Sequence, residues 1–337
     1  MSILALGAIV VTSAAISAGM ILVLLPALRR HALAHPNARS SHRIPTPQGG
    51  GIAVLGAAMA VIAAAVALGL GGPPAQQGPL WWALGAAVLI ALVGVADDIS
   101  PIGVVPRLAL QTVAVGLTIA SLPVEFHIVP MLPWWIERTF LLIACLWFVN
   151  LTNFMDGIDW MTVAEFVPLA AGLAIAGLLG ALPPYGVAVA LALAGGLIGF
   201  APFNRPVARI FLGDVGSLPI GLLFGWLLVL LAGRGHIAAA LVLPLYYVAD
   251  ATLTLLRRIA RHEPFWQAHR THFYQRATDR GWSVSGIVTC VFLVNVTLVA
   301  LATATVLRPG PLMDAAALIC AAGLVYGQLW SFARGKA

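Results

Sequence analysis

Polar side chains recur at every third position in one short stretch of a chain that is otherwise strongly apolar. The stretch NLTNFMDGID carries Asn150, Asn153, Asp156 and Asp159, and it follows directly on an apolar run at 140–149. Side chains three residues apart lie on neighbouring parts of one helical face, and polar groups at the end of a membrane segment usually mark a functional site. The alternative is a short connecting loop that uses Asn, Asp and Gly as turn residues.

Two adjacent carboxylates, Asp97 and Asp98, end another apolar run. Like charges so close repel each other unless a cation lies beside or between them. The pair therefore indicates a bound metal ion or a carboxylate held as a base, and Arg107 at the start of the next predicted helix can face it. The alternative is helix capping, although one Asp would suffice for that.

The segment FLGDVGS at 211–217 places a lone carboxylate, Asp214, shortly after an aromatic residue, Phe211. Asp214 would lie at the N-terminus of the following helix, where capping is a real alternative to a ligand role. The ring of Phe211 lies beside polar groups and can stack on a nucleotide base. This segment is therefore a candidate nucleotide contact.

The largest polar segment, RRIARHEPFWQAHRTHFYQRATDRGW at 257–282, predicts a helix on the membrane surface. Pro264 suits the first turn of such a helix and Gly281 suits its end. His269, His272 and Arg276 would then share one face. The alternative is a surface helix whose arginines merely touch anionic lipids.

Two other features have weaker signals. The loop HPNARSSHRIPTPQGGG at 35–51 joins arginines to a run of glycines, and glycine lets backbone amides come close to an anionic ligand. An ordinary linker is the alternative for this loop. Asp250 lies inside a predicted membrane helix before Arg257, and we interpret it as a structural partner for an arginine.

The elements that must position these residues are membrane helices. The chain of 337 residues is 61% hydrophobic and 9% charged, with a mean hydropathy of +0.98, which excludes a soluble globular protein. Because roughly 20 apolar residues span a bilayer, the sequence predicts an all-α polytopic membrane protein with about eleven transmembrane helices. We expect a single domain, 1–337. The expected spans are 3–28, 50–70, 80–96, 104–122, 137–153, 162–180, 184–201, 211–232, 236–256, 284–306 and 312–333.

The distribution of basic residues predicts the orientation of these spans. Of the 18 Lys and Arg residues, only Arg138, Arg234 and Arg308 fall in one set of alternate loops, and the rest fall in the other set or the C-terminal tail. Cytoplasmic loops carry the excess of Lys and Arg. The N-terminus is therefore expected outside, and the C-terminus and the candidate residues on the cytoplasmic side of the membrane.

Carboxylates, amides, arginines and histidines from five predicted loops thus collect on one side of the membrane. Oxygen ligands without cysteines or clustered histidines suit Mg²⁺ or Mn²⁺ better than zinc, and arginine is a natural partner of phosphate oxygens. This combination predicts a phosphoryl-type reaction between a soluble and a lipid phosphate substrate. Catalysis of that kind is mostly positioning and charge neutralisation.

At these residues the chain resembles the polyprenyl-phosphate N-acetylhexosamine-1-phosphate transferases, the WecA/MraY-like group of glycosyltransferase family 4. The resemblance runs through PNARSSHRIPTPQGGG, the pair Asp97 and Asp98, NLTNFMDGID, FLGDVGS and HRTHFYQR. It implies transfer of a sugar 1-phosphate from a UDP-sugar to undecaprenyl phosphate, with release of UMP. The product would start a lipid-linked glycan for O-antigen or another cell-envelope polysaccharide.

The resemblance also implies a role for each candidate residue. Asp97 and Asp98 would serve the lipid phosphate, one of them as a base, and Asp156, near the nucleotide or its pyrophosphate, would complete the catalytic set. The other implied roles are Mg²⁺ binding by Asn153 and Asp214, with Mn²⁺ as the alternative ion, nucleotide contact by Asp159 and Phe211, and sugar or phosphate binding by His269, Arg270, His272, Arg276 and Arg107.

The chain departs from the family pattern in two places. Trp160 follows the second aspartate of DGID, where family members commonly have glycine, and its indole would reshape the nucleotide edge of the pocket. The segment HRTHFYQ replaces the HIHH-type run of the GlcNAc-1-phosphate enzymes. It resembles the O-antigen-initiating branch, which uses 6-deoxy-N-acetylhexosamines of the FucNAc or QuiNAc type; a UDP-GlcNAc-specific enzyme is the alternative.

The implied partners are a UDP-N-acetylhexosamine, undecaprenyl phosphate and membrane lipids, without nucleic acid, and a homodimer is left open. A membrane transporter is the rival from another class, because it too places charges within helices. A transporter would hold them near the middle of the bilayer, whereas here nearly all lie at helix ends. An inactive membrane scaffold would have lost some of the carboxylates, and all are present.

Overall fold

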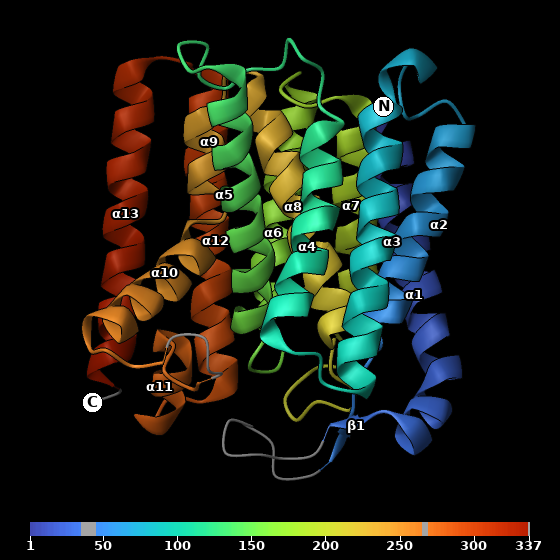
Figure 1. Ribbon diagram of the computed structural model, residues 1–337, viewed down its shortest axis with the longest axis vertical. Helices are drawn as coiled ribbons and strands as arrows, with labels where there is room; N and C mark the ends of the chain where they lie inside the picture. Colours follow the sequence, from blue (N-terminus) through green and yellow to red (C-terminus); the bar gives the residue numbers. More distant parts are fainter. Residues whose placement is uncertain (35–44, 265–268, 336–337) are drawn as a thin grey trace.

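The computed structural model describes residues 1–34, 45–264 and 269–335, and it shows a bundle of apolar helices (Figure 1). The prediction of an all-α polytopic membrane protein is confirmed. The helices are α1 (Ile3–His31), α2 (Gly50–Ala67), α3 (Gly78–Ile99), α4 (Val104–Ala120), α5 (Trp134–Met155), α6 (Met161–Leu178), α7 (Pro184–Phe200), α8 (Asp214–Gly233), α9 (Ile237–Val242), α10 (Leu245–Ala260), α11 (Phe273–Asp279), α12 (Val284–Leu307) and α13 (Pro311–Arg334), with a 3-10 turn, η1 (Pro74–Gln76). Two short strands, β1 (Leu33–Ala34) and β2 (Thr46–Pro47), pair antiparallel with Leu33 opposite Pro47.

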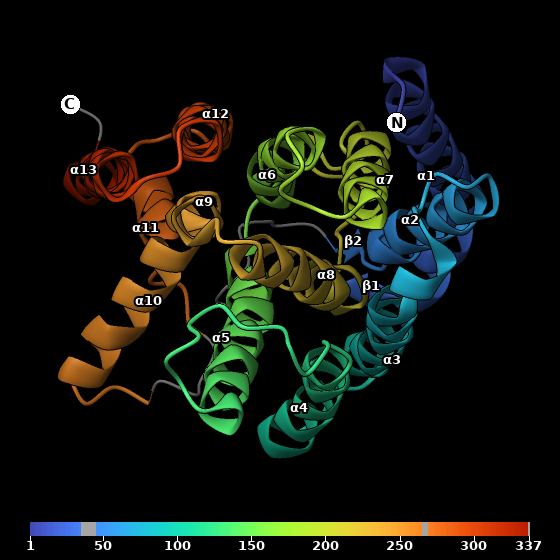
Figure 2. The ribbon, with the colours of Figure 1, turned by 90° about the horizontal axis from the view of Figure 1, so that it is seen from above.

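Within the described ranges, 8 helices are long and apolar enough to cross a membrane, and α4 and α7 are shorter apolar helices. The single span expected at 236–256 is wrong, because the chain breaks there into α9 and α10. Pro244 lies at the break and has no backbone N–H to continue a helix. After the break, α10 runs obliquely and leaves the bundle (Figures 1 and 2).

Helix α8 occupies the centre of the bundle, with α3, α5, α6, α7 and α9 around it (Figure 2). Its most apolar stretch is completely buried. A helix that is hydrophobic on all sides is expected in such a position. Because α8 begins at Asp214, this placement brings a carboxylate to one end of the protein interior.

Small and polar residues join the first helix to the rest of the bundle. The hydroxyl groups of Ser13 and Ser17 on α1 donate to the carbonyl oxygens of Ala192 and Gly196 on α7, at 2.6 and 2.8 Å. Such hydrogen bonds across close helix contacts are typical of membrane proteins, in which apolar burial alone does not drive helices together.

The chain termini lie at opposite ends of the bundle (Figure 1). This is the arrangement expected for the predicted N-terminus outside and C-terminus inside. The end that carries β1, α11 and the C-terminus is also the end to which the predicted positive loops belong. The assignment of that end to the cytoplasm stays a prediction.

Candidate active site

The start of α4 places one arginine among the carboxylates at the end of the bundle. Arg107 Nη1 lies 2.8 Å from Asp97 Oδ2 and 3.8 Å from Asp214 Oδ2. The second Asp97 oxygen accepts from the backbone amide of Ile102 at 2.6 Å. The expectation that Arg107 faces the carboxylate pair is therefore confirmed for Asp97, and the same guanidinium also reaches α8.

Asp98 does not face Arg107 but holds the first turn of α8. Its two carboxylate oxygens accept from the backbone amides of Asp214 and Val215, at 3.1 and 3.2 Å. A carboxylate at a helix N-terminus satisfies amides that have no partner within the helix and interacts favourably with the helix dipole. The capping alternative thus describes the contacts of Asp98, and a role toward the lipid phosphate stays a prediction.

The end of α5 meets the start of α8 through Asn153. Its amide nitrogen Nδ2 donates to Asp214 Oδ1 at 2.6 Å and to Ser217 Oγ at 3.0 Å. The carboxylate of Asp214 therefore contacts side chains of other helices and does not cap its own helix. The N-cap position of α8 is Gly213. The two predicted metal ligands are brought together by the fold.

The expectation that four polar residues share one helical face is wrong, because α5 ends at Met155. Asp156 follows the helix end and accepts from the hydroxyl of Thr162 on α6. Burial raises the pKa of Asp156 to about 7; the Thr162 hydrogen bond opposes this rise, and the nearby carboxylates add to it. An acid with a pKa near neutrality can exchange protons under physiological conditions.

Asp159 is buried and accepts from the backbone amide of Ala208 at 3.0 Å, which ties the DGID turn to the 203–211 segment. This contact is structural, and the nucleotide contact of Asp159 stays a prediction. The backbone amide of Phe211 donates to Pro47 O at 2.8 Å, and the nucleotide contact of Phe211 also stays a prediction.

Trp160 occupies a backbone conformation that favours glycine. Its φ angle is 63°, in the left-handed region, which costs about 1–2 kcal/mol for a residue with a side chain. Its backbone amide donates to Asn204 Oδ1 at 2.8 Å, and its indole Nε1 donates to Ala201 O at 2.6 Å. The indole therefore packs on the turn that follows α7, and these two hydrogen bonds offset the strain.

The glycine run at the start of α2 does not present its amides to an anionic ligand. The amides of Gly50 and Gly51 donate to Phe211 O and Leu212 O, at 2.9 and 2.8 Å. They therefore hold the 211–212 backbone and are not free to bind an anion. The remainder of that loop, 35–44, lies outside the described residues, as do residues 265–268.

The expected helix between Pro264 and Gly281 is wrong in its extent, because α11 begins only at Phe273. His269 precedes it and His272 is its N-cap, so the two histidines do not share a helical face. Their rings nevertheless stack, with centroids 4.9 Å apart. Sequence spacing thus predicted the proximity of the histidines for an incorrect reason.

Arg270 and Arg276 are the two arginines of this segment for which sugar or phosphate binding was predicted. Arg270 Nη1 pairs with Asp279 Oδ1 at 2.9 Å, and its Nη2 donates to Thr278. Burial and three neighbouring arginines lower the pKa of Arg276. Neither Arg270 nor Arg276 lines the cavity described next, and their substrate contacts stay predictions.

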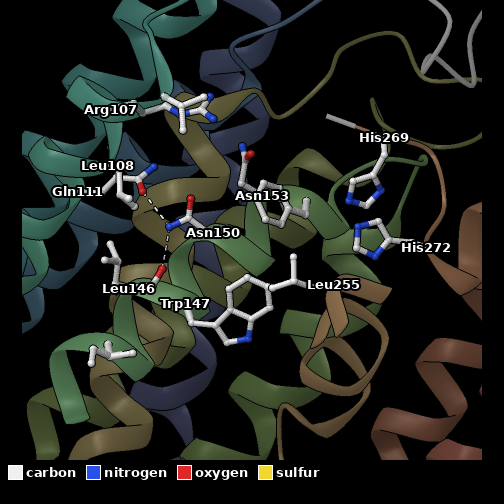
Figure 3. A pocket seen from close by; sticks show the side chains of 13 residues that line it. Arg107, Leu108, Gln111, Leu146, Trp147, Asn150, Asn153, Leu255, His269 and His272 are labelled. Atoms are coloured by element: carbon white, nitrogen blue, oxygen red, sulfur yellow. Dashed lines mark hydrogen bonds between the residues drawn. The ribbon is translucent and has the colours of Figure 1, made fainter. Parts of the chain in front are cut away.

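A cavity of about 520 Å³ opens between α4, α5, α10 and the histidine segment (Figure 3). Its polar end carries Arg107, Asn153, His269 and His272, with Asn153 between the arginine and the histidines. The apolar side chains that line it are Val104, Leu108, Ile143, Leu146, Trp147, Phe154 and Leu255. The cavity thus joins a cationic end to a long hydrophobic wall.

Gln111, which no sequence motif singled out, forms an amide pair with Asn150 at the side of this cavity. Asn150 Nδ2 donates to Gln111 Oε1 at 2.9 Å and to Leu146 O at 2.8 Å (Figure 3). Gln111 follows Arg107 by one helical turn on α4. The i, i+4 spacing of Arg107 and Gln111 at the start of an apolar helix was the signal that could have found it.

The residues around Asp214 fit a magnesium ion by their chemistry. In the part of the chain that the structure describes, no three His, Cys, Asp or Glu side chains are arranged to hold a metal ion alone. Mg²⁺, however, often takes only one or two protein ligands and fills its shell with phosphate oxygens and water. The carboxyl groups of Asp97 and Asp214 lie within hydrogen-bonding reach of each other, an arrangement that a cation or a proton must relieve.

Comparisons with known proteins show what this chain is similar to. Residues 80–232 match the Glycosyl transferase family 4. The chain is similar to the "Probable undecaprenyl-phosphate N-acetylglucosaminyl 1-phosphate transferase" of Bacillus subtilis, with 26% identity over 82% of this chain and 79% of the relative. It is also similar to the decaprenyl-phosphate N-acetylglucosaminephosphotransferase of Mycobacterium tuberculosis, with 28% identity over 89% of this chain and 82% of the relative.

A third relative is a phospho-N-acetylmuramoyl-pentapeptide-transferase of Limosilactobacillus fermentum, with 31% identity over 52% of this chain and 54% of the relative. The family match contains the carboxylate pair of α3, the whole of α5 and most of α8. All three relatives are named as transferases that move a phosphorylated amino sugar. The resemblance drawn from the sequence motifs is confirmed.

Proposed function

We propose that this chain, a relative of glycosyl transferase family 4, transfers an N-acetylhexosamine 1-phosphate from a UDP-sugar to a polyprenyl phosphate and releases UMP. The observation that carries the proposal is the two-ended cavity. An isoprenoid tail needs a long apolar wall, and its phosphate needs a cation and hydrogen-bond donors. Arg107, Asn153 and His272 supply such groups at the polar end.

The walls of the cavity suit a substrate that arrives from the membrane. Leu255 belongs to α10, which leaves the bundle, and Trp147 Nε1 donates to Thr252 on the same helix at 3.1 Å. Ile143 and Leu108 are both well exposed on the apolar helices α5 and α4. A polyprenyl tail can therefore lie along α5 and α10 while its phosphate reaches Arg107.

In the proposed reaction, a bond forms between a lipid-phosphate oxygen and the β-phosphorus of the UDP-sugar, directly or after transfer to a carboxylate. The bond from that phosphorus to the bridging oxygen breaks, and UMP leaves with the electron pair. Arg107 neutralises phosphate charge while Asp97 holds its guanidinium. Asp98 fixes the start of α8 and so the position of Asp214.

We propose Mg²⁺ as the cofactor, held by Asp214 and Asn153, with Mn²⁺ as the alternative. When bound, the ion would supply neutralisation of pyrophosphate charge. Asn153 donates to the carboxylate of Asp214, and its second hydrogen bond, to Ser217, holds the amide in place. The uracil would lie near Phe211 and Asp159, and the sugar near His269.

The donor is proposed to be a 6-deoxy-N-acetylhexosamine of the FucNAc or QuiNAc type, on the strength of the HRTHFYQ segment. The names of the Bacillus and Mycobacterium relatives favour UDP-GlcNAc as the alternative donor. Undecaprenyl phosphate as acceptor, a bacterial inner membrane and a cytoplasm-facing site follow from the same proposal. The product would start an O-antigen or another envelope glycan.

The experiment that tests the function uses purified protein with undecaprenyl phosphate, Mg²⁺ and a panel of UDP-N-acetylhexosamines. We expect one donor to give UMP and a lipid-linked product, and EDTA to abolish both. If UDP-sugars bind but no donor releases UMP, the proposed transferase function is contradicted. If the protein instead takes up a UDP-sugar into proteoliposomes, it is a transporter.

The raised pKa of Asp156 predicts that cation binding depends on pH. Near neutrality the site without a cation holds a proton on Asp156 in a large fraction of molecules. A divalent cation favours the ionised carboxylate and so expels this proton. The apparent Mg²⁺ affinity should therefore rise about tenfold from pH 6 to pH 8, the change expected for one group with a pKa near 7, and level off above.

Calorimetric Mg²⁺ titration in detergent at several pH values checks this prediction. Asp156→Asn, which cannot ionise, should bind with an affinity that rises less steeply over the same range, because the Asp156 contribution is removed while the ligand Asp214 can still take up a proton. An equally steep pH dependence in that variant would assign the effect to another group.

A further inference from the structure

A buried carboxylate on α10 holds the segment that carries the cavity histidines. Asp250 is fully buried. Its Oδ1 accepts from His272 Nδ1 at 3.2 Å and from the amide of Phe273 at 3.0 Å, and its Oδ2 accepts from the amide of Tyr274 at 3.2 Å. The interpretation of Asp250 as the partner of an arginine is wrong, because among the described residues its carboxylate bonds to this segment and to α10 itself.

The contact with Asp250 determines how the imidazole of His272 is presented. When Nδ1 of an imidazole donates to a carboxylate, Nε2 points away from that carboxylate and can contact another group. The ring is further held by stacking on His269 and on Tyr274, with centroids 4.9 and 5.8 Å apart. His272 is 2% exposed yet lines the cavity, so its open edge faces that space.

The same segment is fastened to the end of α5. The Tyr274 hydroxyl donates to Phe154 O at 3.1 Å. A Cβ on Gly157 would lie only 2.2 Å from that hydroxyl, so the tyrosine packs directly on the DGID turn. Through Tyr274, the position of the histidine segment is coupled to the turn that follows Asn153.

We propose that Asp250 is a positioning residue that orients His272 so that its Nε2 meets a phosphate oxygen of the polyprenyl phosphate. This inference rests on the proposed function. A carboxylate behind an imidazole fixes the orientation of the ring and so determines which nitrogen faces the substrate. The other titratable groups near His272 are His269, Tyr274, Tyr246 and, across the cavity, Arg107.

A purely structural role is the competing explanation, because Phe273 and Tyr274 are the first residues of α11 and Asp250 satisfies their amides. The two roles differ in one respect. A positioning residue has no kinetic effect once His272 is gone, whereas a structural residue keeps its effect.

A double-mutant cycle of Asp250→Asn and His272→Gln separates the two roles. We expect each single variant to raise the KM for undecaprenyl phosphate about tenfold or more, in line with the loss of other residues that orient a histidine. The KM for the UDP-sugar should stay within about twofold. The double variant should be no worse than the worse single variant, because both remove the same contact.

Thr254→Ala is the matched control, since Thr254 also donates to Asp250 Oδ1, at 3.3 Å, but does not touch the imidazole. It should behave like the unmodified protein. Three results would show that Asp250 only caps α11. They are additive KM increases in the double variant, equal KM increases for both substrates, and a comparable KM increase in Thr254→Ala. If Asp250→Asn does not fold, Asp250→Glu replaces it in the cycle with the same expectations. Absence of UMP release from the unmodified protein would instead contradict the proposed function.

Discussion

Replacement of Asp214 by alanine is expected to lower UMP release by on the order of 10²–10³-fold, the range found when a single charge-stabilising group is removed from an active site. Three elements contact this residue: Asn153 of α5 lies 2.6 Å and Arg107 of α4 3.8 Å from its carboxylate, and Asp98 of α3 accepts from its backbone amide. Its loss leaves the Asn153 amide and the Arg107 guanidinium without their shared partner. Steady-state UMP release at saturating substrates measures the effect.

Ser217→Ala is the control for this prediction. Ser217 also accepts from Asn153 Nδ2, at 3.0 Å, but carries no charge. Its replacement should change the rate by less than about fivefold, the factor that corresponds to the roughly 1 kcal/mol of an ordinary hydrogen bond. Asp214→Asn, which keeps the size and loses the charge, should behave like Asp214→Ala. A rate for Asp214→Asn close to that of the unmodified protein would show that charge at this position is unimportant.

Much of the architecture could be predicted from the sequence because a bilayer imposes one length and one polarity on its helices. The apolar runs predicted ten of the expected spans close to their observed bounds. The site could also be predicted in outline, since Asp97, Arg107 and Asp214 stand out in a chain with 9% charged residues. In such a chain each charge at a helix end has few partners available, and the fold brings these three together.

The remaining parts of the site depend on contacts between distant segments, which leave no local pattern. Nothing near Asp250 in the sequence indicates that it accepts hydrogen bonds from residues 272–274. The break at Pro244 was missed because the residues on both sides are apolar and read as one span. The apolar wall of the cavity was missed for a related reason. Residues such as Trp147 and Leu255 look the same in sequence whether they face lipid, the protein core or a substrate tail.

The glycines show most clearly how the fold positions the site. Gly94 lies on α3, one turn before Asp98, and a Cβ added there would lie 2.5 Å from the carbonyl carbon of Asp214 and 2.5 Å from the amide nitrogen of Val215. These neighbours are backbone atoms and cannot turn aside. Gly94→Ala is therefore expected to push α3 from the start of α8, to cost about 1–3 kcal/mol of stability as overpacking usually does, and to lower UMP release at least tenfold.

Gly85→Ala on the same helix is the matched control, because a Cβ there has nothing within 4 Å. The two variants make the same chemical change in one helix and differ only in what the new methyl group meets. Alanine is the better helix former by up to about 1 kcal/mol, so Gly85→Ala should melt at the same or a slightly higher temperature and keep full activity. Thermal unfolding in detergent and UMP release measure both variants. If Gly94→Ala retains activity while it melts earlier, α8 tolerates displacement from α3, and the hydrogen bonds of Asp98 to Asp214 and Val215 do not set the catalytic geometry.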